Sequence, residues 1–299
     1  MSSFTGVYTI MPTPFGDDGS LDLGSLETLT DFLIRLGVDG LVVLGVMGEA
    51  PKLSQREQDQ IIKATVQAAK GRVPVFAGSG AEGTDLAVEK SLNALSLGAS
   101  GLLVAPPPVQ NDGVIFEYYR RIDAAVDGLI MLHDYPAATG IKLSPQLVAK
   151  LHAELGQVGV IKLEETPSAP KVSAIRDLGS EISIVGGLGG MFFLEELARG
   201  SDGMMTGFSY PEVLIAIYQA YRGGDNDRAR RLFYGACPIL RYEFQPGVGL
   251  ALRKEVYRQR GAIKSAFVRH PGTQIDDLLK GELASALYAS GLEPEKVNA

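Results

Sequence analysis

A lysine at the end of an apolar stretch could act as a nucleophile. Lys162 follows Gln157-Val-Gly-Val-Ile161, a run whose composition is typical of a buried strand. Burial removes water from the amine, which favours its uncharged form and frees it to attack a carbonyl carbon. A structural lysine that pairs with Glu164 or Glu165 explains the same pattern equally well. The residue types alone leave both interpretations open.

Candidate proton-transfer groups lie at the ends of two apolar runs. His133 ends the run that begins at Leu129, and imidazole titrates near neutral pH. Because side chains alternate between the two faces of a strand, Tyr135 shares a face with His133, and Glu164 shares a face with Lys162. Each of these groups could be an acid or base, and each could equally pack or pair with a neighbour. We predict His133 as the proton carrier, with Tyr135 or Glu164 in reserve.

Two glycine-rich segments could hold an anion. In Gly45-Val-Met-Gly-Glu49, two glycines would let neighbouring backbone amides point at one carboxylate, although a tight turn also explains them. Gly186–Gly190 lies where many barrels bind phosphate, but no lysine or arginine is near, so room for backbone or substrate is the favoured interpretation. The residues that we expect to contact substrate are Val46, Met47, Gly48, Gly187, Met205 and Thr206.

Short apolar runs recur along most of the chain, and each is too short for a helix. They are rich in Val, Ile, Leu or Met, as strands buried on both faces are. Helical segments with clear start signals separate them, such as the capping box Ser54–Glu57 and the pair Ser144-Pro145. The predicted strands are Gly6–Ile10, Gly40–Gly45, Val73–Gly78, Gly101–Ala105, Leu129–His133, Val158–Leu163, Ile182–Gly186 and Gly203–Phe208.

The alternation of eight strands with helices predicts parallel pairing through right-handed crossovers. Eight such units close best as an α/β fold of the (β/α)₈ TIM barrel type. A doubly wound open sheet shares the alternation, but no dinucleotide-binding glycine fingerprint follows the first strand. From about Tyr210 onward the strand signals end, and helices are predicted over Pro211–Tyr221, Asn226–Tyr242, Gly249–Gly261 and Thr273–Ser290. We expect a barrel over residues 1–209 and a helical extension over 210–299 that packs on it.

The composition is that of a globular protein, with 299 residues of which 45% are hydrophobic and 21% charged. A formal net charge of −7 argues against nucleic-acid binding. Cys237 is the one cysteine, so no intrachain disulfide forms, which fits a reducing cytosol. The three histidines match no metal-ligand spacing, so neither a metal nor a cofactor is expected. Without a targeting segment or a run near the roughly 18 apolar residues of a membrane span, we expect a cytoplasmic protein that binds no membrane.

Motifs spread over nearly the whole chain resemble those of one known family. They are Gly6-Val-Tyr-Thr, Thr13-Pro-Phe, Gly45-x-x-Gly-Glu49, Pro136-x-x-Thr-Gly140, Val160-Ile-Lys162, Lys254, Gly261, Arg269 and Pro271. Together they resemble the dihydrodipicolinate synthase and N-acetylneuraminate lyase superfamily, class I aldolases on a (β/α)₈ barrel. The resemblance implies that Lys162 forms an imine with a 2-oxo acid and that the amides of Met47 and Gly48 hold its carboxylate. It also implies a homo-oligomer, either a tetramer built from dimers or a dimer.

Several positions depart from the family pattern. Val46 and Met47 replace the two threonines of the usual loop, so their side chains bring no hydroxyl groups. His133 stands at the place of the catalytic tyrosine, and Ala138 at that of the arginine with which dihydrodipicolinate synthases hold a second carboxylate. Ala105–Pro108 falls where those enzymes borrow a tyrosine from a neighbouring subunit. The Gly-x-Asp-Glu motif of neuraminate lyases is also absent.

The sequence therefore predicts a Schiff-base lyase that cleaves or dehydrates a 2-oxo acid, with a 2-keto-3-deoxy sugar acid as the favoured substrate. An imine on Lys162 would serve as an electron sink for either reaction. One alternative is a pyruvate condensation of the dihydrodipicolinate synthase kind. The other is a barrel that binds a 2-oxo acid without turnover, which the missing tyrosine keeps open.

Overall fold

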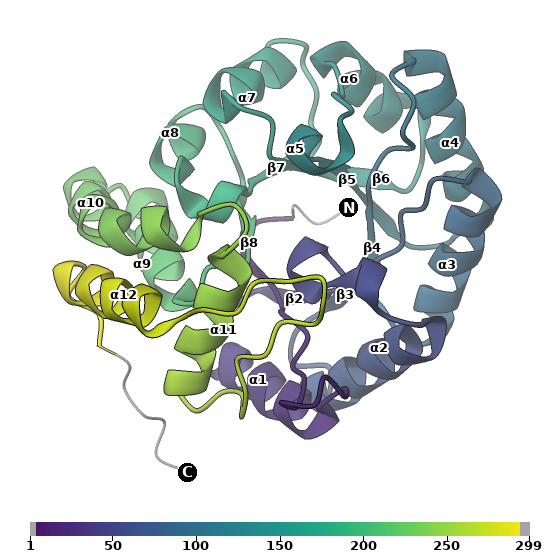
Figure 1. The fold of residues 1–299 in the computed structure, drawn as a ribbon. Coiled ribbons are helices and arrows are strands. Elements are labelled where there is room, and N and C mark those ends of the chain that lie inside the picture. Colours follow the sequence, from purple (N-terminus) through teal and green to yellow (C-terminus); the bar gives the residue numbers. More distant parts are fainter. Residues whose placement is uncertain (1–3, 294–299) are drawn as a thin grey trace.

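The computed structural model describes residues 4–293, which form a closed barrel of eight parallel strands (Figure 1). Each strand pairs with its neighbours in sequence, and the last pairs with the first. The strands are β1 (Gly6–Ile10), β2 (Gly40–Val43), β3 (Val75–Gly78), β4 (Gly101–Val104), β5 (Leu129–Asp134), β6 (Val158–Leu163), β7 (Ser183–Gly186) and β8 (Gly203–Thr206). The predicted (β/α)₈ barrel is thus confirmed.

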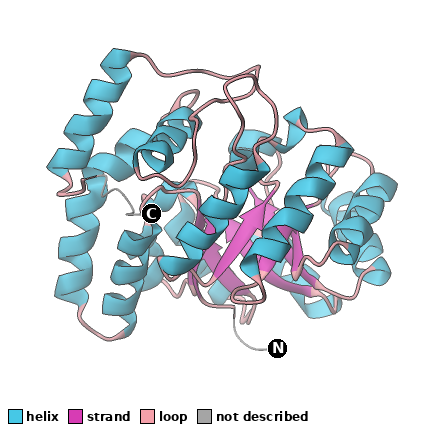
Figure 2. Ribbon diagram, turned by 90° about the horizontal axis from the view of Figure 1, so that it is seen from below, coloured by secondary structure: helices cyan, strands magenta, loops and turns pink. Residues whose placement is uncertain are grey.

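Helices surround the barrel in Figure 1, and the view in Figure 2 shows them on both sides of the strands. The outer helices are α1 (Leu23–Arg35), α2 (Gln55–Ala69), α3 (Thr84–Ser96), α4 (Asp112–Ala125), α6 (Pro145–Glu154), α7 (Ser168–Arg176), α8 (Phe193–Ala198) and α9 (Pro211–Arg222). Short helical turns occupy the loops after β2, β5 and β7, namely η1 (Val46–Gly48), η2 (Ala50–Lys52), α5 (Pro136–Thr139) and η3 (Leu188–Gly190).

The start signals found in the sequence begin helices in the structure. At α2, the Ser54 hydroxyl accepts from the Glu57 amide, and the Glu57 carboxylate accepts from the Ser54 amide. At α6, the Ser144 hydroxyl accepts from the amide of Leu147. Each such cap satisfies amides that have no partner inside the helix and contributes about 1 kcal/mol.

Several strands end at residues other than those predicted. β2 ends at Val43 rather than Gly45, because the next residue, Leu44, has a φ of 58° that leaves the extended conformation. β8 ends at Thr206 rather than Phe208, and β5 continues to Asp134. Because β2 ends early, the chain turns at Leu44 into the loop that contains η1.

Apolar side chains fill the barrel interior, and every strand contributes to this layer. Its members are Tyr8, Ile10, Val42, Phe76, Leu103, Met131, Val160, Val185 and Met205. Because Val160 points inward, Lys162 two residues later lies on the same inward face, one layer nearer the carboxyl ends of the strands. The packed layer therefore forms the floor beneath Lys162.

The C-terminal helices gather on one side of the barrel (Figure 1). After α9 they are α10 (Asn226–Glu243), α11 (Gly249–Gln259) and α12 (Asp277–Ala289). Val7 and Met204 of the barrel share one hydrophobic cluster with Phe233, Leu252 and Leu283 of these helices. Helix α9 follows β8 and packs on β1, so it completes the eighth β/α unit. The boundary that we predicted between residues 209 and 210 falls inside this unit.

Membrane-spanning helices and metal-ligand clusters are both absent from residues 4–293. No helix in this range is long and apolar enough to cross a membrane. No group of three or more His, Cys, Asp or Glu side chains within it is arranged to hold a metal ion.

Candidate active site

Strands β5 and β6 bring Lys162 and His133 together. The two residues are register partners in the ladder between these strands. Lys162 is 5% exposed, and its Nζ lies 3.2 Å from Nε2 of His133 and contacts the carboxylate of Glu164. The same Nε2 of His133 lies 2.8 Å from Oε2 of Glu164. Three of the predicted residues therefore form one buried cluster at the carboxyl ends of β5 and β6.

Burial and the mutual contacts set the charges in this cluster. Burial alone would raise the pKa of Glu164, but positive Lys162 and the hydrogen bond with His133 outweigh it and hold that pKa well below its usual range. Burial lowers the pKa of His133, and Lys162 lowers it further, so the ring is neutral at pH 7. The amide of Leu188 donates to Oε1 of Glu164 at 2.9 Å. Glu164 is therefore an ionised acceptor that is held at both oxygens.

The structure contains the ion pair that the sequence left open, formed with Glu164 rather than Glu165. Glu165 instead accepts from Lys171 at 2.5 Å and from Lys142 at 2.9 Å. The pair between Lys162 and Glu164 does not fill the barrel mouth, because a cavity of about 60 Å³ opens beside both side chains. The amine is thus accessible to a small ligand as well as paired.

Two cavities with shared walls open at this end of the barrel. The small cavity is lined by Ile10, Gly45, Val46, Met47, Tyr135, Lys162, Glu164, Gly189, Thr206, Gly207, Phe244 and Arg253. A second cavity, of about 650 Å³, shares six of these residues: Val46, Met47, Tyr135, Glu164, Phe244 and Arg253. It continues past Ala137, Lys142 and Gln245. Its volume is in the range of small-molecule sites.

Three of the expected substrate-binding residues lie at the small cavity. Val46, Met47 and Thr206 line it, together with Lys162. Among the described residues, none accepts a hydrogen bond from the backbone amide of Val46 or of Met47. These two amides therefore remain available to an anion.

The other three expected substrate-binding residues, Gly48, Gly187 and Met205, line neither cavity. The amide of Gly48 donates to the carbonyl of Gly45 at 2.9 Å, so it belongs to a tight turn. A Cβ on Gly187 would come within 2.3 Å of the Glu164 side chain, so this glycine makes room for Glu164. Met205 is fully buried in the packed layer below the site. Local glycine patterns and strand ends could not distinguish these roles from ligand contact.

Tyr135 borders the site without joining the Lys162 cluster. Its ring stacks on His133, with centroids 5.8 Å apart, and it lines both cavities. Burial raises the pKa of the Tyr135 hydroxyl, which stays protonated at neutral pH. Of the two aromatic candidates, His133 is the one that reaches the nitrogen of Lys162.

An arginine that the sequence analysis missed also faces the small cavity. Arg253 of α11 is 7% exposed, and its Nε donates to Oε2 of Glu243 at 3.3 Å. Its Nη1 lies 3.0 Å from Sδ of Met47, while its buried Nη2 has no hydrogen-bond partner among the described residues. Phe244 completes this wall of the cavity. Arg253, Glu243 and Phe244 come from the C-terminal extension, far from Lys162 in sequence.

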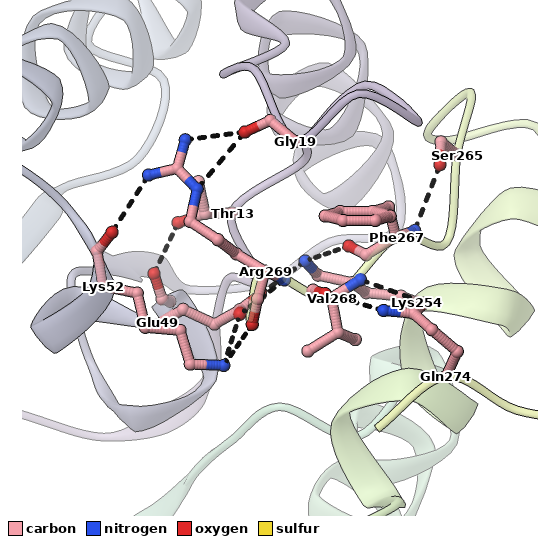
Figure 3. Close-up of polar contacts among 11 residues, drawn as sticks. Thr13, Gly19, Glu49, Lys52, Lys254, Ser265, Phe267, Val268, Arg269 and Gln274 are labelled. Carbon is pink, nitrogen blue, oxygen red and sulfur yellow. Dashed lines mark hydrogen bonds and ion pairs between the residues drawn. The ribbon is translucent and has the colours of Figure 1, made fainter. Parts of the chain in front are cut away.

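A buried ionic network holds the loop after β2 against the C-terminal segment (Figure 3). Glu49 accepts from Lys254 at 2.6 Å and from Lys52 at 2.9 Å. The backbone amide of Arg269 donates to the same carboxylate at 3.1 Å. Glu49 is 2% exposed and Lys254 is 0% exposed. The network therefore fixes the loop that carries Val46 and Met47 at the cavity.

Replacing Lys254 by methionine should destabilise the protein by about 3 kcal/mol, because it leaves part of the Glu49 charge buried without a partner. Denaturant unfolding followed by circular dichroism measures the loss. The double variant Lys254→Met with Glu49→Gln should regain part of the stability, since it removes both members of the pair. An equal free energy of unfolding in Lys254→Met and in the parent chain would contradict the anchoring role of this network.

The fold and the site define a barrel enzyme with a buried lysine at the carboxyl ends of its strands. The family model described as "Dihydrodipicolinate synthetase family" matches residues 3–290. The chain belongs to the dihydrodipicolinate synthetase family and is a lyase of the class I type.

Individual relatives resemble the chain over almost its full length. L-2-keto-3-deoxyarabonate dehydratase of Azospirillum brasilense is 31% identical over 298 residues, which cover 97% of this chain and 94% of that protein. The crystal structure of dihydrodipicolinate synthase from Rhodopseudomonas palustris has a TM-score of 0.91 at 33% identity and covers 96% of this chain and 97% of that one. A prophage protein of the same family from E. coli K12, solved in complex with pyruvate, has a TM-score of 0.90 at 27% identity and covers 97% and 99%.

Proposed function

We propose that this protein dehydrates a 2-keto-3-deoxy sugar acid through an imine on Lys162. The observation that carries the proposal is the ionised Glu164 carboxylate, which contacts both Lys162 and His133 beside a cavity. The similarity to the dehydratase of A. brasilense and to a pyruvate-bound barrel supports a 2-oxo acid as the substrate class.

Imine formation is the first part of the reaction. The substrate carboxylate lies at the amides of Val46 and Met47, which places C2 beside Nζ of Lys162. Nζ attacks C2, the carbonyl oxygen leaves as water, and a positively charged imine results. The ring of His133 is neutral and its Nε2 lies 3.2 Å from Nζ, so it can take the proton that the amine releases.

Elimination of water follows from the position of Glu164. C3 of the substrate is two bonds from the imine nitrogen, so a carboxylate in contact with Nζ also lies near the C3 proton. Glu164 takes this proton, the electrons flow into the imine, and the C4 hydroxyl leaves as water after it receives a proton. Protonated Tyr135, on the cavity wall, is the donor for that hydroxyl. Hydrolysis of the remaining imine then frees the product and Lys162.

Aldol cleavage uses the same imine but needs a base at a different atom. Cleavage of the bond between C3 and C4 removes a proton from the C4 hydroxyl, which lies further from Nζ than C3 does. The contact between Glu164 and Nζ therefore favours dehydration. A screen of 2-keto-3-deoxy acids tests this choice directly. We expect loss of water without pyruvate release, whereas pyruvate release would indicate an aldolase and saturable binding without product would indicate a non-catalytic barrel.

The pH profile of kcat/KM should have an acidic limb that lies below the ordinary histidine pKa of about 6.5. His133 acts in its neutral form, and burial and Lys162 both lower its pKa. Activity should therefore persist at pH 6.5 and fall at lower pH as the ring gains a proton. His133→Gln should remove this limb and lower kcat about 100-fold, the scale of general acid–base catalysis. An identical acidic limb in the His133→Gln variant would exclude His133 from proton transfer.

We also infer that the protein forms a homo-oligomer, as the family resemblance implies. Val109 and Val114 are 45% and 46% exposed. They follow Ala105–Pro108, the segment at which the family resemblance implies a subunit contact. Exposed apolar side chains at such a place support an interface. Light scattering after size-exclusion chromatography measures the assembly.

A further inference from the structure

Arg253 carries a buried donor that no described residue uses. The side chain is 7% exposed, and Nη2 has no hydrogen-bond partner among residues 4–293. Leaving a charged donor unpaired in the interior is costly, so such groups are rare in folded proteins. The unused Nη2 therefore indicates a ligand that completes its hydrogen bonding.

The neighbours of the guanidinium show where this donor lies. Nη1 lies 3.0 Å from Sδ of Met47, on the loop after β2. A Cβ on Gly189 would be 3.2 Å from Nη2, so a larger residue there would crowd the donor. Met47, Gly189 and Arg253 all line the small cavity that also contains Lys162. The guanidinium of Arg253 therefore lies among residues that line the cavity into which Lys162 opens.

A buried carboxylate fixes the orientation of Arg253. Glu243 is 0% exposed, and its Oε2 accepts from Nε of Arg253. The backbone amide of Ser209 donates to the same oxygen at 3.2 Å, and the Ser209 hydroxyl binds the other oxygen. The pair with Glu243 therefore holds the guanidinium of Arg253 beside the cavity that this residue lines.

We propose that Arg253 binds the C1 carboxylate of the 2-oxo acid, together with the backbone amides of Val46 and Met47. The assignment rests on the proposed function and names the carboxylate site within it. The side chains of Val46 and Met47 offer no hydroxyl, so the loop alone supplies amides without a charge. A guanidinium against Met47 adds the positive charge that a carboxylate binds well.

The sizes of the two cavities decide which end of the substrate Arg253 binds. C1 is bonded to C2, the atom that Lys162 attacks. The C1 carboxylate therefore stays in the cavity of about 60 Å³ that both Lys162 and Arg253 line. The rest of a sugar acid extends into the larger cavity of about 650 Å³. Arg253 borders both, but its contact with Met47 places it beside the loop amides.

Inactivation by borohydride in the presence of pyruvate tests the assignment, because pyruvate has a C1 carboxylate but no sugar chain. For Arg253→Met, we expect the half-saturating pyruvate concentration to rise about 10- to 100-fold, the effect of losing hydrogen bonds to a charged group. Arg253→Lys should give a smaller rise, since it keeps the charge but loses the planar fork. Wild type should also prefer pyruvate over uncharged pyruvamide, and Arg253→Met should lose this preference.

Arg260 provides the matched control. It is 6% exposed, pairs with Glu212, and lines neither of the two cavities. Arg260→Met should leave the half-saturating pyruvate concentration unchanged. If Arg253→Met does not fold, the double variant with Glu243→Gln removes the charge pair as a unit and is measured in its place.

The outcomes separate this assignment from the proposed function. If the half-saturating pyruvate concentration is equal in Arg253→Met and wild type, Arg253 does not bind the C1 carboxylate and the assignment is overturned. This holds even if the KM for the full sugar acid rises, because Arg253 would then bind the outer part of the substrate. Failure of wild type to trap pyruvate at all would contradict the proposed function itself. If wild type is trapped and the half-saturating pyruvate concentration rises in Arg253→Met but not in Arg260→Met, the result supports both the assignment of Arg253 and the proposed function.

Discussion

Lys162→Arg should abolish turnover while the protein stays folded. Arginine keeps a positive charge beside Glu164, so the buried ion pair survives, but a guanidinium forms no imine with a ketone. The expected loss of kcat is on the order of 10⁴-fold or more, the scale on which removing a catalytic nucleophile acts. Steady-state kinetics with the 2-keto-3-deoxy sugar acid as substrate measures the loss of turnover, and a thermal unfolding curve measures whether the variant is folded.

Lys171→Arg is the matched control for this substitution. Lys171 is 8% exposed and paired with Asp134 and Glu165, but it lines neither cavity of the site. We expect this control to retain activity within a few-fold of wild type, because arginine at position 171 keeps the ion pairs with Asp134 and Glu165. If Lys162→Arg were equally active, Lys162 would be a structural partner of Glu164 and the imine mechanism would be wrong.

Glu164→Gln should reduce dehydration about 10²- to 10⁴-fold, the range of general acid–base catalysis. The amide is nearly isosteric and still accepts from Leu188, but it takes no proton from C3. Imine formation does not require removal of the C3 proton. The variant should therefore still form an imine with pyruvate that borohydride reduces. Comparing turnover with trapping in the same variant separates the two steps.

Proton exchange at C3 gives a second test of Glu164 as the base that removes the C3 proton. In deuterium oxide, wild type should exchange the methyl hydrogens of pyruvate, which nuclear magnetic resonance detects, and Glu164→Gln should lose this exchange. Glu165→Gln is the control, because Glu165 pairs with Lys171 and Lys142 rather than with Lys162. Undiminished exchange in Glu164→Gln would assign the base to another group.

The barrel and half of its site follow from local sequence patterns. Short apolar runs that alternate with capped helices are sufficient for a parallel barrel, and the structure confirms it. Period-two alternation correctly places Glu164 beside Lys162, because side chains two residues apart share a strand face. Strand pairing then brings in His133, since β5 and β6 are consecutive in sequence and adjacent in the barrel.

The rest of the site depends on contacts that local patterns do not encode. Arg253 lies on α11 with Arg258 nearby, and nothing in that stretch shows which arginine is buried at the barrel mouth. Gly187 resembles an anion-binding glycine, but it makes room for the Glu164 side chain. Leu44 ends β2 through its backbone conformation, although as an apolar residue it continues the buried run that predicts the strand.

The covalent bond between Lys162 and a 2-oxo acid is the central claim, and mass spectrometry tests it most directly. Wild-type protein is incubated with pyruvate, reduced with borohydride, digested and mapped by peptide. We predict a single reduced pyruvate adduct on the peptide that contains Lys162, and no adduct when either reagent is omitted. Saturable pyruvate binding with an unmodified Lys162 would contradict the account.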